Sequence, residues 1–346
     1  MSELLSKSVF GYPMIFDKKG DQCIVRIDEL GISEKSQSRG RAIRNVFDRI
    51  KEITKLDLIE PKTKDSHIEK QDEIQIKMFK LNQKLINFGF SIIVENISEN
   101  DIEKLEKVCD EINLNENYTT KEIEVIENKI INIIIPYILD TKHRALNMTS
   151  LIMKTNHISK FSHLIEQSYI SLFRGEYIST VMVLIPVIEG VLLSLYGFDF
   201  SSGSKPKEHQ LLNKWAELQI NTKNSNLVDQ YIIDEYIRAF IEIWENTVFT
   251  KHQLAEAKLY FNRNYITHLM GEGRFYSRNN AFKLINLIDL LAYVLSACSE
   301  NENSSDINVE DYHIREIYYE SLLSKQIINK IEYNILNGHE NFKGYI

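Results

Sequence analysis

The chain is poor in residues that break helices and in residues that could cross-link it. Only 5 prolines and 13 glycines occur in 346 residues, which disfavours a loop-rich β-sandwich and favours long helices. The three cysteines, Cys23, Cys109 and Cys298, are widely spaced and form no CxxC or Cys/His cluster. We therefore expect neither a disulfide framework nor a zinc site, and a reducing cytoplasm suits this composition best.

Several motifs that mark nucleotide or hydrolase sites are also missing. The chain contains no GxGxxG, GxxxxGK[ST] or GxSxG sequence, so nothing indicates a dinucleotide cofactor, a P-loop or an α/β-hydrolase nucleophile. The histidines His143, His157 and His163 are isolated, without the set of cysteine or carboxylate partners that a metal needs. We predict no metal and no other cofactor.

One apolar run is long enough to cross a bilayer. It covers residues 178–198, about the length of a membrane-spanning helix. Glu189 lies near its middle, where a charge is costly in lipid, and Pro186 is close by. A buried helix of a soluble bundle is therefore the better interpretation, and no membrane partner is predicted. Residues 1–10 lack the apolar core of a signal peptide.

The first third of the chain mixes strand and helix signals. Apolar runs at residues 13–16 and 23–27 flank a Lys-Lys-Gly-Asp turn and predict a hairpin. A polar loop and a basic amphipathic helix follow, and Ser66 with Glu69 forms a capping-box pattern that opens a helix to about residue 87. Residues 88–94 are expected to form a strand.

From residue 119 onward the pattern predicts almost nothing but helix. Thr119 and Glu122 form a second capping-box pattern, which opens a helix that Pro136 kinks or ends. Further helices are expected at residues 147–173, 176–197, 207–219, 225–247, 251–262, 264–270, 279–299 and 308–336. The chain is thus predicted to be mainly α, with a smaller mixed α+β region at residues 1–120, a connecting helix at 121–145, a helical-bundle domain at 146–300 and a C-terminal helix at 301–346.

The segment 259–271 carries the residues that point most clearly to chemistry. It reads LYFNRNYITHLMG and places Arg263 and Asn264 shortly before His268. An apolar helix with one acidic residue, Glu189, precedes it, and two glycines and a second apolar helix follow. This motif and this order of helices resemble the HEPN superfamily of small helical ribonuclease domains, over roughly residues 145–300. The NRNYITH form of the motif is similar to that of bacterial abortive-infection and other defence proteins. Residues 1–145 resemble no family.

The resemblance implies a metal-independent endoribonuclease, and the residue types fit such chemistry. RNA carries its own nucleophile, the 2′-OH, so cleavage needs a proton acceptor or donor of near-neutral pKa and a cation for the phosphate. His268 supplies the first, since the pKa of an unperturbed histidine is about 6.5. Arg263 supplies the second, because its planar guanidinium matches phosphate oxygens. The expected products carry a 2′,3′-cyclic phosphate and a 5′-OH.

The spacing of the motif constrains how its residues cooperate. Residues five apart in a helix are rotated by about 140° net, so Arg263 and His268 would not share a face. Asn264 and His268 are four apart and do share one, so Asn264 is expected to orient the imidazole. One histidine cannot act as both base and acid without reprotonation. The resemblance to HEPN domains implies a solution to this problem, in which two chains dimerise so that their two motifs face a common cleft. The chain has a single Arg-x4-His sequence, so we predict a homodimer with a composite site.

The charge distribution restricts where RNA could bind. The net charge of −8 makes the chain a poor general ligand for nucleic acid, because phosphate affinity comes from lysine and arginine. Residues 251–283 nevertheless contain six cations and two acids, which is the local excess that an RNA cradle needs. Lys258, Arg274 and Arg278 are the candidate RNA contacts beside the motif.

Glu189 is the remaining candidate site residue. It is an acid within an apolar run, where an unpaired charge would be costly. The favoured interpretation is structural support, in which Glu189 pairs with Arg263 or His268 and holds the motif in place. A direct catalytic role and simple exposure at a kink are the alternatives.

The resemblance further implies a phage-defence or toxin effector, with an N-terminal region that senses or regulates through a partner or ligand. A structural role for Arg263 and His268, in which they pair with Glu272 or cap a helix, is the competing interpretation. The chain would then be a non-catalytic HEPN-like module that binds RNA or protein, or a helical scaffold.

Overall fold

The computed structural model describes twelve stretches of the chain. They are residues 2–9, 12–19, 22–27, 32–36, 46, 66–93, 97–112, 119–199, 204–218, 227–245, 276–299 and 308–337. The chain divides into two compact units, residues 1–76 with 219–235, and residues 77–218 with 236–346. Each unit is described by itself below.

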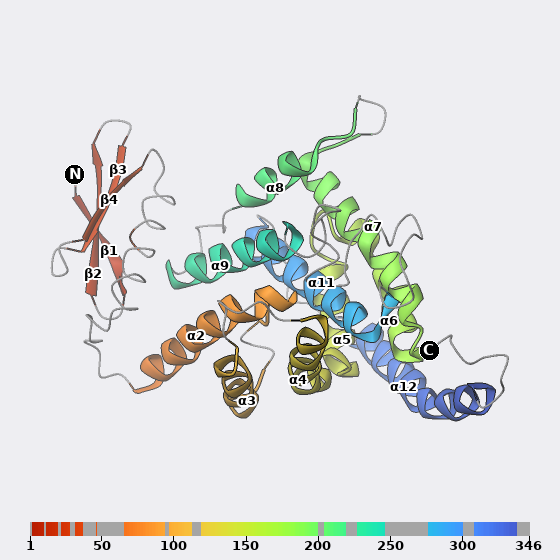
Figure 1. Cartoon of the computed structure of the whole chain (residues 1–346). Coiled ribbons are helices and arrows are strands. Elements are labelled where there is room, and N and C mark those ends of the chain that lie inside the picture. Colours follow the sequence, from red (N-terminus) through yellow and green to blue (C-terminus); the bar gives the residue numbers. More distant parts are fainter. Residues whose placement is uncertain are drawn as a thin grey trace. The chain divides into compact units, whose positions relative to one another are not determined.

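The first unit contains an antiparallel sheet in which sequence neighbours pair. Its strands follow the order β1 (Ser2–Val9), β2 (Tyr12–Lys19), β3 (Gln22–Ile27) and β4 (Ile32–Ser36) (Figure 1). In β3 the alternate residues Cys23, Val25 and Ile27 are buried, as expected for a strand with one face in a core. The pairing of β2 with β3 confirms the predicted hairpin.

The second unit begins within α2 (Ser66–Leu85), which confirms the helix predicted to start at Ser66. The segment after α2 differs from the prediction. The strand expected at residues 88–94 is wrong: η2 (Ile86–Phe88) is a single 3-10 turn, and Gly89 follows at φ 81°. The backbone groups of Ser91 and Ile92 form hydrogen bonds with side-chain amides and not with a neighbouring strand. Asn82 accepts from the Ile92 N–H at 2.9 Å and donates to the Ile92 carbonyl at 3.0 Å. Asn286 accepts from the Ser91 N–H at 2.9 Å.

Side-chain caps define the starts of the next two helices. The Ser98 hydroxyl accepts from the Asp101 N–H and begins α3 (Glu99–Asp110). Thr119 and Glu122 form a reciprocal capping box at the start of α4 (Thr120–Ile138), which confirms the prediction. α4 continues for two residues beyond Pro136, so the proline lies inside the last turn of the helix.

The single helix predicted at residues 147–173 is wrong, because turn residues interrupt it between Ile152 and Ser162. α5 (Thr141–Leu146) continues into a π-helical turn, η4 (Asn147–Ile152), and α6 (Ser162–Arg174) starts after a 3-10 turn, η5 (Ser159–Phe161). Between them His157 has a φ of 69°, a left-handed conformation that a helix cannot contain. The local sequence Lys-Thr-Asn-His also has weak helix propensity.

The remaining helices complete a mainly helical chain, as predicted. They are α7 (Tyr177–Tyr196), α8 (Glu208–Ala216), α9 (Leu227–Ile243), α11 (Arg278–Cys298) and α12 (Val309–Asn337). α11 packs against α7 and α4, and α12 packs against α5 and α6 (Figure 1). The helices predicted at 251–262 and 264–270 lie outside the described residues.

Among the described helices, α7 and α11 are long and apolar enough to cross a membrane. Length and composition alone are weak evidence for a membrane span, because the core helix of a soluble protein can have the same length and composition. In the most apolar 18-residue stretch of each helix, 56% is buried inside the protein for α7 and 78% for α11. α11 also carries the charged residues Lys283 and Asp289, both buried.

Candidate functional site

The predicted catalytic residues lie in the segment between α9 and α11. Arg263, Asn264 and His268 fall outside the described residues, as do the predicted RNA contacts Lys258 and Arg274. The description of the chain stops at residue 245, after α9, and resumes at residue 276, just before α11. Two predicted site residues are described, Arg278 on α11 and Glu189 on α7.

Arg278 is the first residue of α11 and is exposed. The Ser277 hydroxyl caps the helix by accepting from the Asn280 N–H at 3.3 Å. The Arg278 guanidinium lies 5.9 Å from the centroid of the Phe282 ring. A cation is unfavourable at a helix N-terminus, where the macrodipole is positive, so capping does not explain this residue. The exposed guanidinium is the described group placed closest in sequence to the motif with a charge suited to phosphate.

The aromatic residues near Arg278 form a small, partly buried cluster. The rings of Tyr177 and Phe282 meet edge to face, with centroids 6.2 Å apart. Burial raises the pKa of the Tyr177 phenol, and the charge of Arg278 opposes that rise. The phenol therefore stays neutral at physiological pH and is a hydrogen-bonding group rather than a base.

Glu189 lies in α7 and is 9% exposed. Its carboxylate forms an ion pair with Lys205, in the stretch that leads into α8. The alternative of simple exposure at a kink is therefore wrong. The pairing of Glu189 with Arg263 or His268 falls outside the described residues and stays a prediction. Lys205 is a partner that sequence reasoning missed, since 16 residues and a turn separate the two side chains.

The sequence also failed to reveal a buried ion pair between α5 and α11. Arg144 of α5 donates to both oxygens of Asp289, at 2.6 and 2.7 Å, and Asn147 donates to the same carboxylate at 2.6 Å. The side chains of Arg144 and Asp289 are 2% and 6% exposed. Although burial disfavours its charge, Asp289 keeps the pKa of Arg144 above its ordinary value. The Tyr169 ring lies 5.5 Å from the guanidinium, and burial raises the pKa of its phenol.

A second buried pair joins α11 to α4. Lys283 Nζ lies 2.6 Å from Glu127 Oε1, and the two side chains are 4% and 10% exposed. Lys283 was one of the six cations counted in the predicted RNA-binding patch. Its burial and its pairing with Glu127 remove it from any surface that RNA could reach, so this part of the charge prediction is wrong. The two buried pairs fix α11 to α4 and α5 along its length.

The histidines predicted to be isolated have mixed surroundings. Burial lowers the pKa of His143, helped by the neighbouring Arg144 charge. Burial also lowers the pKa of His157, whose Nδ1 lies 3.2 Å from Ser194 Oγ. Lys160 donates to the same hydroxyl at 2.9 Å. In the described part of the chain, no group of three or more His, Cys, Asp or Glu side chains could hold a metal ion.

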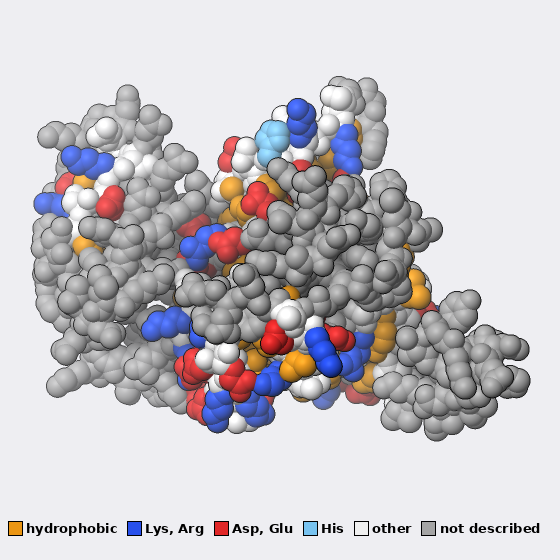
Figure 2. Space-filling view, in the orientation of Figure 1, with side chains coloured by type: hydrophobic (Ala, Val, Ile, Leu, Met, Phe, Trp, Pro, Cys, Tyr) orange, Lys and Arg blue, Asp and Glu red, His pale blue; other side chains and the backbone are white. Residues whose placement is uncertain are grey.

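One described face of the protein carries charges of both signs (Figure 2). Over the face around α3 and α4, Lys and Arg side chains are interspersed with Asp and Glu (Figure 2). Several of these charges pair, such as Lys77 with Glu106 at 2.6 Å and Lys104 with Asp101 at 2.6 Å. Mixed charge of this kind attracts RNA weakly.

Comparisons with known proteins identify no relative. No family model, no curated protein and no solved structure matches the chain. The resemblance to HEPN domains is therefore one of sequence alone, carried by the motif at residues 263–268 and the predicted order of helices.

Proposed function

We propose that the protein is a metal-independent endoribonuclease of the HEPN type, with Arg263 and His268 at its active centre. The observation that carries the proposal is the sequence Arg-Asn-x-x-x-His, placed between α9 and α11 of a mainly helical unit. An earlier helix of the proposed domain, α7, carries the buried acid Glu189. Exposed Arg278 then supplies a further cation at the start of α11.

The proposed reaction transfers the phosphoryl group within RNA. A base removes the proton of the 2′-OH, and the 2′ oxygen attacks the adjacent phosphorus. The bond from phosphorus to the 5′ oxygen breaks, and an acid protonates that oxygen. The products are a 2′,3′-cyclic phosphate and a 5′-OH end, so no water is consumed in this step. Arg263 stabilises the negative charge that gathers on the phosphate oxygens.

Two copies of the chain divide the proton transfers. His268 of one copy acts as base and His268 of a second copy acts as acid, which removes the need for reprotonation within one turnover. Asn264, four residues before His268, orients the imidazole. The site is therefore composite, and the active form is a homodimer.

The cysteine composition suggests the compartment of this activity, and the resemblance suggests its biological role. We assign the protein to the cytoplasm, as an antiviral defence or toxin effector whose N-terminal sheet unit senses a partner or ligand. The buried pairs Arg144–Asp289 and Lys283–Glu127 support the assignment of α11, the helix that follows the motif in the sequence, as a rigid frame. Rigid support of this kind is what a catalytic group needs to hold its geometry.

Cleavage by the purified protein in excess EDTA tests the proposal. We expect the wild type to cut RNA under these conditions and His268→Ala to lose activity by at least about 100-fold, the usual contribution of a general acid or base. His209→Ala is the matched control, because His209 is an exposed histidine on α8 and should leave the rate unchanged. Cleavage that EDTA abolishes, or that survives in His268→Ala, would contradict the proposal.

A further inference from the structure

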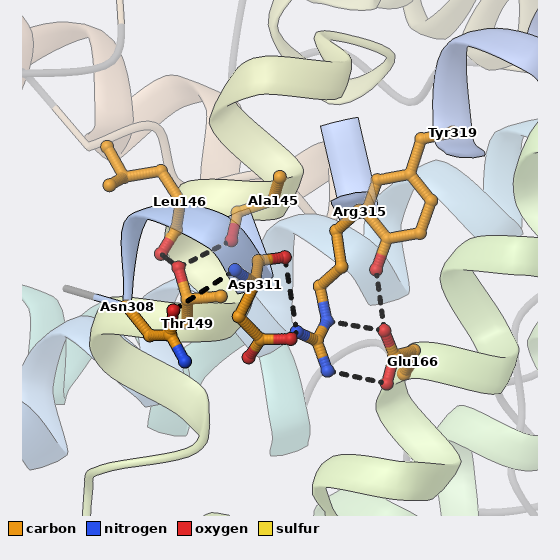
Figure 3. Close-up of polar contacts among 8 residues, drawn as sticks. All are labelled: Ala145, Leu146, Thr149, Glu166, Asn308, Asp311, Arg315 and Tyr319. Carbon is orange, nitrogen blue, oxygen red and sulfur yellow. Dashed lines mark hydrogen bonds and ion pairs between the residues drawn. The ribbon is translucent and has the colours of Figure 1, made fainter. Parts of the chain in front are cut away.

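α12 uses one face to bind the helical bundle. Arg315 Nε donates to Glu166 of α6 at 2.6 Å, and the Tyr319 hydroxyl lies 3.3 Å from the same carboxylate (Figure 3). Arg315 also pairs with Asp311, one turn earlier on α12. Tyr319 is fully buried and stacks on Phe173, with ring centroids 5.1 Å apart. The polar and aromatic side chains of this face therefore all have partners within the same chain.

The opposite face of α12 carries large apolar side chains that the bundle leaves exposed. Ile314 is 60% exposed, Ile317 is 66% exposed and Tyr318 is 43% exposed. At about 100° per residue, Ile314, Ile317 and the exposed Ser321 fall within about 60° of one another, with Tyr318 on their flank. We call Ile314, Ile317, Tyr318 and Ser321 the α12 stripe. An apolar stripe with this exposure is typical of a surface that binds another molecule.

Charged residues of opposite sign lie at the two ends of the α12 stripe. Glu310 precedes it and Lys325 follows it, both exposed and both on the stripe's side of the helix. They are 15 residues apart, or about 22 Å at the rise of an α-helix, so they cannot pair within one helix. A second α12 that runs antiparallel to the first would place each Glu310 beside Lys325 of the other copy. The same pairing would bring Ile314 to Ser321, and Ile317 to Tyr318, of the other copy.

One flank of the stripe has the same self-complementary pattern. His313 and Glu320 are both exposed and lie seven residues apart on this flank. In the antiparallel arrangement, His313 of one copy approaches Glu320 of the other. A surface whose charges match their own reversed order fits a twofold axis, the commonest symmetry of protein dimers.

We propose that the α12 stripe binds the same stripe of a second copy of this chain, antiparallel and around a twofold axis beside Ile317. The proposal rests on the homodimer of the proposed function and locates one of its interfaces. The second copy is the occupant that the order of charges selects, because a membrane or an unrelated helix requires no such self-matching. Dimers with an isologous interface of this kind are expected to respond symmetrically to a single substitution.

The wild type and three variants of the protein test this assignment by sedimentation equilibrium. The wild type should dimerise, and Ile317→Glu should weaken the dimer at least 10-fold, because it buries two glutamates at the axis. Glu310→Lys should weaken it several-fold, since it places two lysines together at each end. Glu310→Lys combined with Lys325→Glu should restore wild-type affinity. Restoration can come only from a second copy, because the two positions are too far apart to interact within a helix.

Ile178→Glu is the matched control for Ile317→Glu. Ile178 lies on α7 and is 62% exposed, close to the 66% of Ile317. We expect Ile178→Glu to leave the dimer intact. All the substituted side chains are exposed, so thermal unfolding should be unchanged at a concentration where the wild type is monomeric. A variant that unfolds would be replaced by Ile317→Ser, which is expected to weaken the dimer in the same direction.

Several results would overturn the assignment. These are a wild type that is monomeric at micromolar concentration, a dimer unaffected by Ile317→Glu, a dimer broken equally by Ile178→Glu, and a double charge reversal that fails to restore affinity. RNA cleavage, measured on the same samples, separates this proposal from the nuclease. Dimers that depend on Ile317 but never cut RNA support the α12 interface alone, whereas cleavage by a dimer indifferent to Ile317→Glu supports the nuclease alone.

Discussion

Removing the carboxylate charge of Asp289 should be among the most destabilising single changes in the helical unit. Asp289→Asn keeps the size of the side chain but leaves Arg144 as a buried cation without a counter-ion. The two side chains are 6% and 2% exposed, so water cannot replace the lost partner. Three hydrogen bonds of 2.6 to 2.7 Å converge on this carboxylate. Breaking a buried pair in this way costs about 3–5 kcal/mol, and we expect a loss in that range.

Urea denaturation, followed by circular dichroism, measures this loss. Glu106→Gln is the matched control, because Glu106 pairs with Lys77 at the same 2.6 Å distance but the two side chains are 42% and 33% exposed. Solvent screens the exposed pair, so its loss should cost less than about 1 kcal/mol. Replacing both Arg144 and Asp289 by apolar residues should recover much of the stability. A cost for Asp289→Asn no larger than that of Glu106→Gln would refute the reasoning.

Three further predictions concern single residues. Hydrogen bonds from Lys104, Tyr137 and Ser98 lower the pKa of Asp101 to about 2. The contribution of Asp101 to stability is therefore present above pH 4 and is lost as the pH falls towards 2. An NMR titration of the Asp101 carboxyl with a midpoint near 4 would contradict this. Thr119→Ala removes the capping box of α4 and should cost about 1 kcal/mol in urea denaturation. Gly190→Ala should lower the thermal midpoint, because the new methyl carbon would lie 2.7 Å from the Phe161 ring; an unchanged or raised midpoint would show that the ring yields.

Features encoded by neighbouring residues could be predicted from the sequence. The capping box at Thr119 needs only the side chain three residues later, and the structure confirms it. The hairpin needs two apolar runs and a short turn, and β2 and β3 confirm it. α7 coincides with a long apolar run and was predicted to within a residue or two at each end. In each case local preference and the final packing agree.

Features that depend on distant residues could not be predicted. In place of the strand expected at residues 88–94, the side-chain oxygens of Asn82 and Asn286 accept hydrogen bonds from the N–H groups of Ile92 and Ser91. Asn286 lies 195 residues from its partner Ser91. The pairing of Arg144 with Asp289 spans 145 residues, and that of Lys283 with Glu127 spans 156. Charge counting assigned Lys283 to a surface patch because a sequence does not show which lysine has a buried partner.

The candidate site was predicted only at the level of residue types. Arg263, Asn264 and His268 were selected by spacing and by a family resemblance, and Glu189 by its charge within an apolar run. The structure gives Glu189 a partner, Lys205, that no local pattern indicates. Long side chains of adjacent helices and loops meet according to tertiary packing, which a single sequence leaves open.

The chemistry of the RNA ends tests the central claim most directly. RNA cut by the wild type in excess EDTA is analysed for its terminal groups, with His268→Ala run beside it. The account predicts 2′,3′-cyclic phosphate and 5′-OH ends in the wild type and neither in the variant. Ends that carry a 3′-OH and a 5′-phosphate would mean that water, and not the 2′-OH, attacks the phosphorus, and would contradict the account.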